Sequence, residues 1–135
     1  MICSSSPAAA YQASQNLLNK HGNEIQGVFC PNESVAIGMM LALRDIGKAG
    51  GAIKLVGFDA GTQSVDGMKA GDVQGLVVQD PMKMGYLGVR VMIDHINGKT
   101  VDKRIDTGVV MVTQDNMEEA AIKALLYPPL DQYLK

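Results

Sequence analysis

Polar side chains that could hold a ligand follow three apolar runs of this sequence. Asn32 comes just after the run 25–30, Asp59 directly follows the run 53–58, and Gln79 closes the run 75–79. Amide and carboxylate groups pair well with vicinal hydroxyls because they offer donors and acceptors together. A carboxylate that accepts hydroxyl hydrogen bonds also makes a strong, charge-assisted contact. The set therefore favours a polyol, such as a sugar, as the ligand.

Two of these three residues have an alternative, purely structural role. Asn32 could cap the helix expected to begin near Ser34, and Asp59 could cap the helix expected after Gly61. Position alone leaves both roles open. Three such residues at three successive strand ends favour a binding site.

Catalytic, metal and cofactor chemistry find little support in the sequence. The two histidines, His21 and His95, are expected on helix surfaces, where neither has a nucleophile to activate. The sequence holds no HExxH, GxGxxG or GxxxxGK[ST] motif. Cys3 and Cys30 are expected to be buried strand residues and not a disulfide framework. We therefore expect no catalytic residue, no metal site and no cofactor.

Composition excludes further classes of function. The 135 residues are 47% hydrophobic and 19% charged, with a formal net charge of −2, which is typical of one globular domain. No basic cluster exceeds the pair Lys103-Arg104, so nucleic acid is not an expected partner. The first residues lack the basic and apolar regions of a signal peptide, and no apolar run reaches transmembrane length.

Helical segments alternate with short apolar runs along the chain. Strands are expected at 2–4, 25–30, 53–58, 75–79 and 107–113, and helices at 7–21, 34–46, 61–70, 81–97 and 117–126. The apolar runs are continuous, which favours an α/β fold with a doubly wound parallel sheet and helices on both faces. In such sheets ligands bind beyond the carboxyl ends of the strands, where the three polar residues lie.

Four segments, in their order along the chain, resemble those of ribose-type periplasmic sugar-binding proteins of bacterial ABC importers. They are Gly27-Val28-Phe29-Cys30-Pro31-Asn32-Glu33-Ser34, Val56-Gly57-Phe58-Asp59, Leu76-Val77-Val78-Gln79-Asp80-Pro81 and Arg104-Ile105-Asp106-Thr107-Gly108-Val109-Val110. The resemblance covers nearly the whole chain. It implies two lobes that close on a ligand about a hinge, of which this chain is the carboxy-terminal part.

The resemblance also divides the chain. Residues 1–79 would be an α/β segment of the second lobe, and 80–104 a crossover helix that belongs to the first lobe. Residues 105–135 would be the return strand and carboxy-terminal helix. The first lobe and one strand-helix unit of the second lobe, which often carries a sugar-binding arginine, have no counterpart here. About half of the expected site is therefore missing.

By the same resemblance, Asn32 and Asp59 would contact sugar hydroxyls from the second lobe and Gln79 from a hinge strand. The family often has an aromatic residue after the first strand. This sequence has Ala8-Ala9-Ala10 there, which makes the following Tyr11 the candidate. The resemblance further implies a small-molecule sugar ligand, an importer permease as partner of the full-length protein, and a periplasmic or extracytoplasmic location.

Two other classes of function remain open. The effector-binding domain of a lac-repressor-type regulator shares this fold, but a Pro-x-Asp turn is usual there, and Gly50-Gly51-Ala52-Ile53 lacks it. A small enzyme of the same fold is the third possibility, because fold alone does not define function. The missing nucleophile, base and metal set argues against it.

The missing parts also predict self-association. The helix 81–97 carries Met84, Leu87 and Val91 on one face, with no first lobe to cover them. By the resemblance, a strand is also missing between those of Cys3 and Cys30, which leaves open edges. We expect a homodimer that exchanges an element. The alternative is that the helix folds back on its own lobe.

Overall fold

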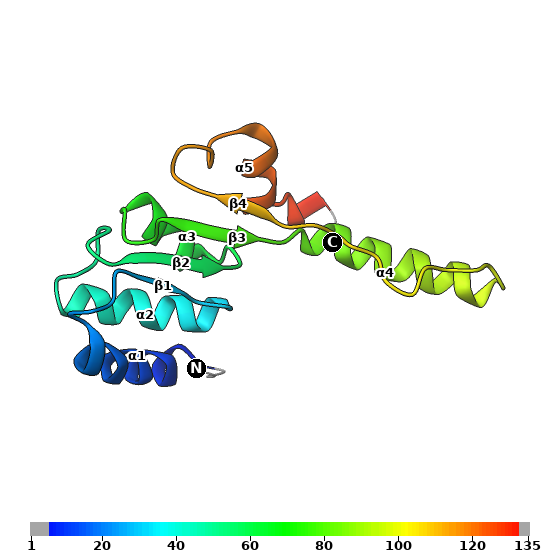
Figure 1. Cartoon of the computed structure of the whole chain (residues 1–135). Helices are drawn as coiled ribbons and strands as arrows, with labels where there is room; N and C mark the ends of the chain where they lie inside the picture. Colours follow the sequence, from blue (N-terminus) through cyan, green and yellow to red (C-terminus); the bar gives the residue numbers. More distant parts are fainter. Residues whose placement is uncertain (1–5, 133–135) are drawn as a thin grey trace.

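The computed structural model describes residues 6–132 as an α/β fold in which helices and strands alternate (Figure 1). The helices are α1 (Pro7–His21), α2 (Glu33–Asp45), α3 (Thr62–Lys69), α4 (Pro81–Ile96), α5 (Ala120–Leu126) and the 3-10 turn η1 (Leu130–Gln132). The strands are β1 (Gly27–Phe29), β2 (Lys54–Phe58), β3 (Gly75–Val78) and β4 (Val110–Val112). The expected strand at 2–4 lies outside the described residues.

The four strands form one mostly parallel sheet in the order β1-β2-β3-β4. β1, β2 and β3 are parallel, as predicted, with Val28 opposite Leu55 and Gly57 opposite Leu76. β4 is antiparallel to β3, which corrects the prediction of an all-parallel sheet. The chain travels outward from β3 through α4 and comes back along the same path, so β4 enters beside the end of β3 and runs in reverse.

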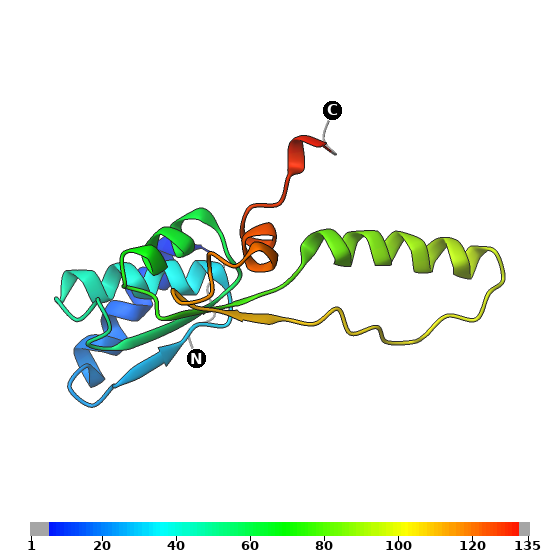
Figure 2. The same cartoon turned by 90° about the horizontal axis from the view of Figure 1, so that it is seen from above.

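The sheet is covered by helices on one face, which corrects the prediction of helices on both. Figure 2 shows α2, α3 and α5 on the same side of the strands, while α1 packs against α2 beside β1. Leu55, Leu76 and Val112 point to this side and are fully buried. On the other face Phe29 is 57% exposed and Met111 49% exposed. Strands that are apolar on both faces normally have both faces covered. Within the described part of the chain, the second face of this sheet has no covering element.

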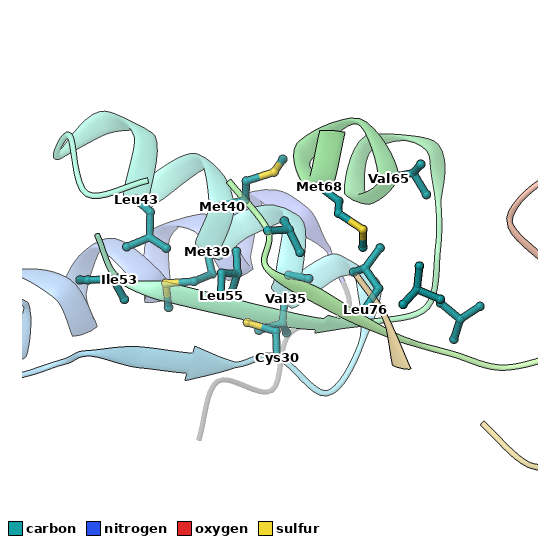
Figure 3. Packing of buried hydrophobic residues seen from close by; sticks show 14 of the residues in the cluster. Cys30, Val35, Met39, Met40, Leu43, Ile53, Leu55, Val65, Met68 and Leu76 are labelled. Atoms are coloured by element: carbon teal, nitrogen blue, oxygen red, sulfur yellow. The ribbon is translucent and has the colours of Figure 1, made fainter. Parts of the chain in front are cut away.

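The core lies between α2 and the sheet (Figure 3). Met39, Leu43, Leu55, Met68 and Leu76 are among its fully buried side chains. They interdigitate across the layer, and α2 lies in contact with α1, β2 and α3.

Gly38 allows α1 and α2 to approach closely. A Cβ at this position would lie 2.5 Å from the backbone nitrogen of Tyr11 and 2.7 Å from the Cβ of Ala10. No larger residue fits without separating the two helices, so this glycine sets the distance between them.

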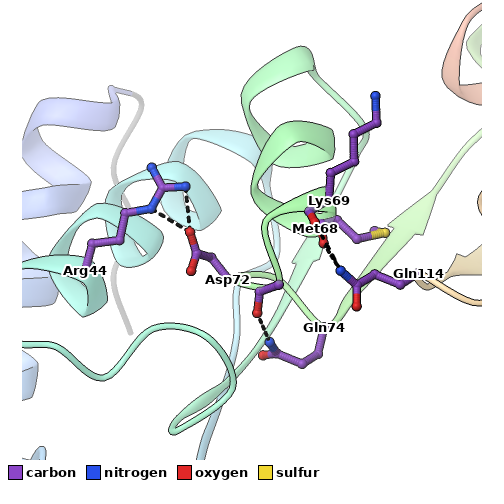
Figure 4. Close-up of polar contacts among 7 residues, drawn as sticks. Arg44, Met68, Lys69, Asp72, Gln74 and Gln114 are labelled. Atoms are coloured by element: carbon purple, nitrogen blue, oxygen red, sulfur yellow. Dashed lines mark hydrogen bonds and ion pairs between the residues drawn. The ribbon is translucent and has the colours of Figure 1, made fainter.

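Polar contacts fix the end of the sheet where β2 and β3 begin (Figure 4). Arg44 Nε donates to Asp72 Oδ2 at 2.7 Å, and Gln74 Nε2 donates to the carbonyl of Gly71 at 2.6 Å. Gln74 Oε1 also accepts from the backbone N–H of Leu55 at 2.7 Å. Gln114 donates to the carbonyl of Met68 at 2.7 Å. These bonds hold the turn after α3, at the end of the sheet opposite the carboxyl ends of β2 and β3.

Helix α4 stands apart from the rest of the molecule (Figures 1 and 2). It begins at an Asp80 cap, whose Oδ1 accepts from the N–H of Lys83 at 2.9 Å, and it has no buried residue. The returning segment 99–109 runs beside it, and Lys83 Nζ donates to the carbonyl of Thr107 at 3.3 Å. The first residues of α4, Pro81 and Met82, line a cavity together with α5 and Pro128-Pro129. The helix does not fold back on its own lobe. Within residues 6–132, no helix is long and apolar enough to cross a membrane.

Candidate functional site

The carboxyl ends of β1, β2 and β3 lie at one edge of the sheet. Asn32, Asp59 and Gln79 each follow one of these strands within three residues. Neighbouring strands are about 4.8 Å apart, so the three positions are within reach of one small ligand. This edge is the one predicted from the sequence.

A pocket of about 320 Å³ opens at this edge between the sheet and α5. It is lined by Glu33, Asp59, Ala60, Val78, Gln79, Pro81, Leu125 and Pro128. Asp59 and Gln79, both half-buried, thus share one cavity. Its volume lies at the lower end of the roughly 300–1,000 Å³ typical of small-molecule sites.

Asp59 adopts a left-handed backbone conformation, with φ of 67°. It is the one residue other than glycine with positive φ in the described chain. Its N–H donates to the carbonyl of Val77 at 2.9 Å, which holds the turn at the end of β2. Such a conformation costs about 1–3 kcal/mol and occurs preferentially at functional sites. Glycine would adopt the same backbone conformation without strain. The turn alone therefore does not account for an aspartate at this position.

Asn32 uses part of its side chain as a helix cap. Its Oδ1 accepts from the N–H of Val35 at 3.0 Å, at the amino end of α2. The structural role that the sequence left open is thus present. The residue is exposed, and the amide NH₂ group can still donate to a ligand. Asn32 does not line the pocket that Asp59 and Gln79 share.

Glu33 also lines the pocket, although it was not among the predicted site residues. Its carboxylate lies against Gly61, where a Cβ would be only 1.5 Å from Oε1. Gly61 therefore keeps space for this carboxylate beside the start of α3. The signal in the sequence is the polar pair Asn32-Glu33 after an apolar run, in which Glu33 lies nearly as close to the strand end as Asn32 does.

Tyr11 does not reach this edge, although it was predicted as a weak candidate. Its hydroxyl donates to Asp45 Oδ2 and accepts from Gln15 Nε2 at 2.8 Å. Asp45 is the last residue of α2, roughly 18 Å along the helix from Glu33. The hydroxyl is thus occupied at the far end of α2, where its bond to Asp45 raises the pKa of the phenol.

The charges of the pocket restrict its ligands. Glu33 and Asp59 are acidic, and no lysine, arginine or histidine among residues 6–132 lines the cavity. An anionic ligand would be repelled, whereas neutral hydroxyl groups can donate to both carboxylates. No group of three potential metal ligands gathers anywhere in residues 6–132. The arrangement is suited to a neutral, hydroxyl-rich molecule.

Comparison with known proteins identifies the class to which this fold and edge belong. Residues 2–100 match the family model of the periplasmic binding protein domain, so the chain belongs to that family. The chain is 33% identical over 100 residues to the ribose import binding protein of Bacillus subtilis, covering 74% of this chain and 32% of that protein.

Solved structures agree in fold. An ABC transporter solute-binding protein from Agrobacterium vitis with bound D-fucose has 34% identity and a TM-score of 0.83, over 90% of this chain and 41% of that one. A chain described as an ABC transporter, LacI family transcriptional regulator, from Brachyspira murdochii has 28% identity and a TM-score of 0.75, over 87% and 40%. This chain therefore spans about a third to two-fifths of the length of these proteins.

Proposed function

We propose that this chain is the carboxy-terminal part of a sugar-binding protein that serves an ABC importer. The observation that carries the proposal is the pocket at the strand ends, which Asp59 and Gln79 line together with Glu33 and, in the described part of the chain, with no cationic residue. The relatives named above, which include a ribose import binding protein and a D-fucose complex, support a monosaccharide as the ligand.

The proposed mechanism is binding without chemical conversion. Asp59 and Glu33 would accept hydrogen bonds from sugar hydroxyls, and the Gln79 amide would both donate and accept. Asn32 would add a donor from the rim. No nucleophile is poised beside a base at this edge, so we propose no catalytic step and no cofactor.

Binding by this chain alone is expected to be weak. The pocket opens to solvent, and hydroxyl groups that keep facing water gain little net free energy from the protein. In a full-length relative a second lobe would enclose the sugar, and we propose that this chain contributes one wall of such a site. The full-length protein would act outside the cytoplasm and deliver the sugar to an importer permease, with no role for nucleic acid.

Ligand-observed saturation-transfer NMR tests the proposal. With D-ribose and D-fucose in large excess, we expect signal transfer that is lost in Asp59→Asn and in Gln79→Ala. Tyr11→Phe is the matched control, because Tyr11 lies at the other end of α2, and it should keep the transfer. Equal transfer from all four proteins, or none from the unmodified chain, would contradict the proposal.

A second candidate is the effector-binding domain of a lac-repressor-type regulator. The similarity to the Brachyspira murdochii chain favours it. Both functions use the same edge for a small molecule, so sugar binding does not separate them. A neighbouring gene for a permease or an ATPase would favour transport, whereas a DNA-binding head encoded in the same reading frame would favour the regulator.

We also propose that the chain forms a homodimer. Its accessible surface is 8741 Å², whereas a folded monomer of 14.4 kDa exposes roughly 6,800 Å². The excess of about 1,900 Å² lies well above the roughly 800 Å² that each partner buries in an ordinary interface. Much of this surface is apolar, because α4 has no buried residue and one face of the sheet is open.

A further inference from the structure

The pocket at the strand ends has a polar side and an apolar side. Glu33, Asp59 and Gln79 supply its carboxylates and its amide, and the other lining residues are apolar, namely Ala60, Val78, Pro81, Leu125 and Pro128. Glu33 begins α2, which packs on β2, whereas Leu125 belongs to α5, which follows β4 on the other side of β3. The carboxylates and the apolar residues of α5 therefore enter the pocket from two different directions (Figure 1).

The apolar side is a firm wall without polar side chains. Ala60 and Leu125 are half-buried and pack against the hydrophobic core, and Val78 is 3% exposed, so the fold fixes their positions. Pro81 and Pro128 have no backbone N–H to donate. A hydroxyl group that faces this wall loses water without gaining a side-chain partner, which is unfavourable. A methyl group in the same place gains free energy from burial.

A second cavity continues the apolar side beyond this wall. Its volume is about 300 Å³, and it shares Pro81, Leu125 and Pro128 with the first pocket, so these three residues lie between the two cavities. Its other apolar lining residues include Met82, Ala121, Ala124 and Pro129. Its acidic residue, Asp80, already accepts from the N–H of Lys83 as the cap of α4. The surroundings of Leu125 thus stay apolar on both sides of the wall.

We infer that the ligand of this pocket is a deoxy sugar that carries a methyl group where common hexoses carry a hydroxymethyl group. The ring hydroxyls face Glu33 and Asp59, and the methyl group lies against Leu125 and Pro128. Hydroxyls and methyl project from different sides of a sugar ring, so one molecule satisfies both sides of the pocket. Leu125 is the residue that determines this specificity. The inference rests on the proposed function and names the class of sugar.

D-fucose and D-galactose form a matched pair of probes, because they differ in a methyl group against a hydroxymethyl group. Titration of the ¹⁵N-labelled chain with each sugar gives both dissociation constants. We expect D-fucose to bind about tenfold more tightly, the discrimination that one small group provides in an apolar pocket. In saturation-transfer spectra of D-fucose, the methyl protons should receive the largest share of the signal, because they contact the wall.

Leu125→Asn tests the wall itself. Its amide can pair with the additional hydroxyl of D-galactose, so the preference for D-fucose should fall to about onefold. Pro128→Ser changes the same wall from outside α5, and it should lower the preference even where Leu125→Asn disturbs the helix. Leu130→Asn is the matched control, since Leu130 is exposed on η1 and lines neither cavity, and it should keep the preference. Far-ultraviolet circular dichroism of each variant verifies that it is folded.

The outcomes separate this inference from the proposed function. Equal or tighter binding of D-galactose by the unmodified chain overturns the inference and leaves sugar binding intact. A preference for D-fucose that survives in both folded wall variants also overturns it, because the methyl group then lies elsewhere. Binding of neither sugar contradicts the proposed function, and the inference fails with it.

Discussion

At the scale of single residues, the conformation of Asp59 carries the most information. A left-handed aspartate at a strand end is more costly than glycine, yet its carboxylate enters the pocket beside Glu33 and Gln79. If Asp59 binds the sugar as proposed, this position exchanges some stability for binding. The two roles can be separated by substitution.

Asp59→Gly and Asp59→Ala separate strain from binding. Both remove the carboxylate, so both should abolish the saturation transfer from sugar. Only glycine removes the strain, so Asp59→Gly should be more stable to urea than Asp59→Ala by about 1 kcal/mol. A loss of more than about 2 kcal/mol in Asp59→Gly would mean that the carboxylate holds the fold together and is not kept for a ligand.

Cys30 shows the opposite case, a reactive group that the fold makes inert. It is 1% exposed at the end of β1, and burial raises the pKa of its thiol to about 12. The thiolate is the reactive form, and it is almost absent at neutral pH. The predicted burial is confirmed for Cys30, which lies directly after β1 and not within it, while Cys3 lies outside the described residues.

At the scale of elements, the spacing between α1 and α2 is set by Gly38. A side chain there would collide with backbone atoms of Tyr11 and Ala10, which cannot move without displacing α1. The two helices form the outer layer over the core, so their separation would open the layer above Met39 and Leu43.

Gly38→Val should therefore lower the free energy of unfolding by about 2–3 kcal/mol. Thermal denaturation followed by circular dichroism measures the change. Gly88→Ala is the control, because a Cβ at Gly88 has no neighbour within 4 Å and alanine favours a helix, so the melting temperature should stay the same or rise. Equal melting temperatures for Gly38→Val and the unmodified chain would show that α1 does not pack as described.

The sequence predicted most elements because their signals are local. The helices expected from residues 7 and 81 both begin at a proline, and the side chains of Ser6 and Asp80 cap them. The reversed direction of β4 was not predictable in this way, because it depends on where a long connection returns. The prediction of Tyr11 as a site residue was wrong because the direction of its side chain depends on how α1 packs. Ala10 is buried against α2, and Tyr11, about 100° further around the helix, is directed toward Asp45.

At the scale of the whole molecule, residues 6–132 form a folded core that leaves apolar surface uncovered. Among these residues, one face of the sheet is open and helix α4 has no buried residue. The predicted helices on both faces followed from the continuous apolar runs of the strands, whereas helices cover one face of the sheet within residues 6–132. The proposed site likewise consists, within the described residues, of one wall that carries the carboxylates of Glu33 and Asp59.

The central claim is that the ends of β1, β2 and β3 bind a neutral sugar. Chemical-shift mapping of the ¹⁵N-labelled chain during titration with D-ribose tests it most directly. We predict weak, saturable shifts confined to residues 32–33, 59–61 and 79–81, and their loss in Asp59→Asn. Saturable shifts centred on other parts of the chain, or no shifts at 100-fold and higher excess over the protein, would contradict the claim.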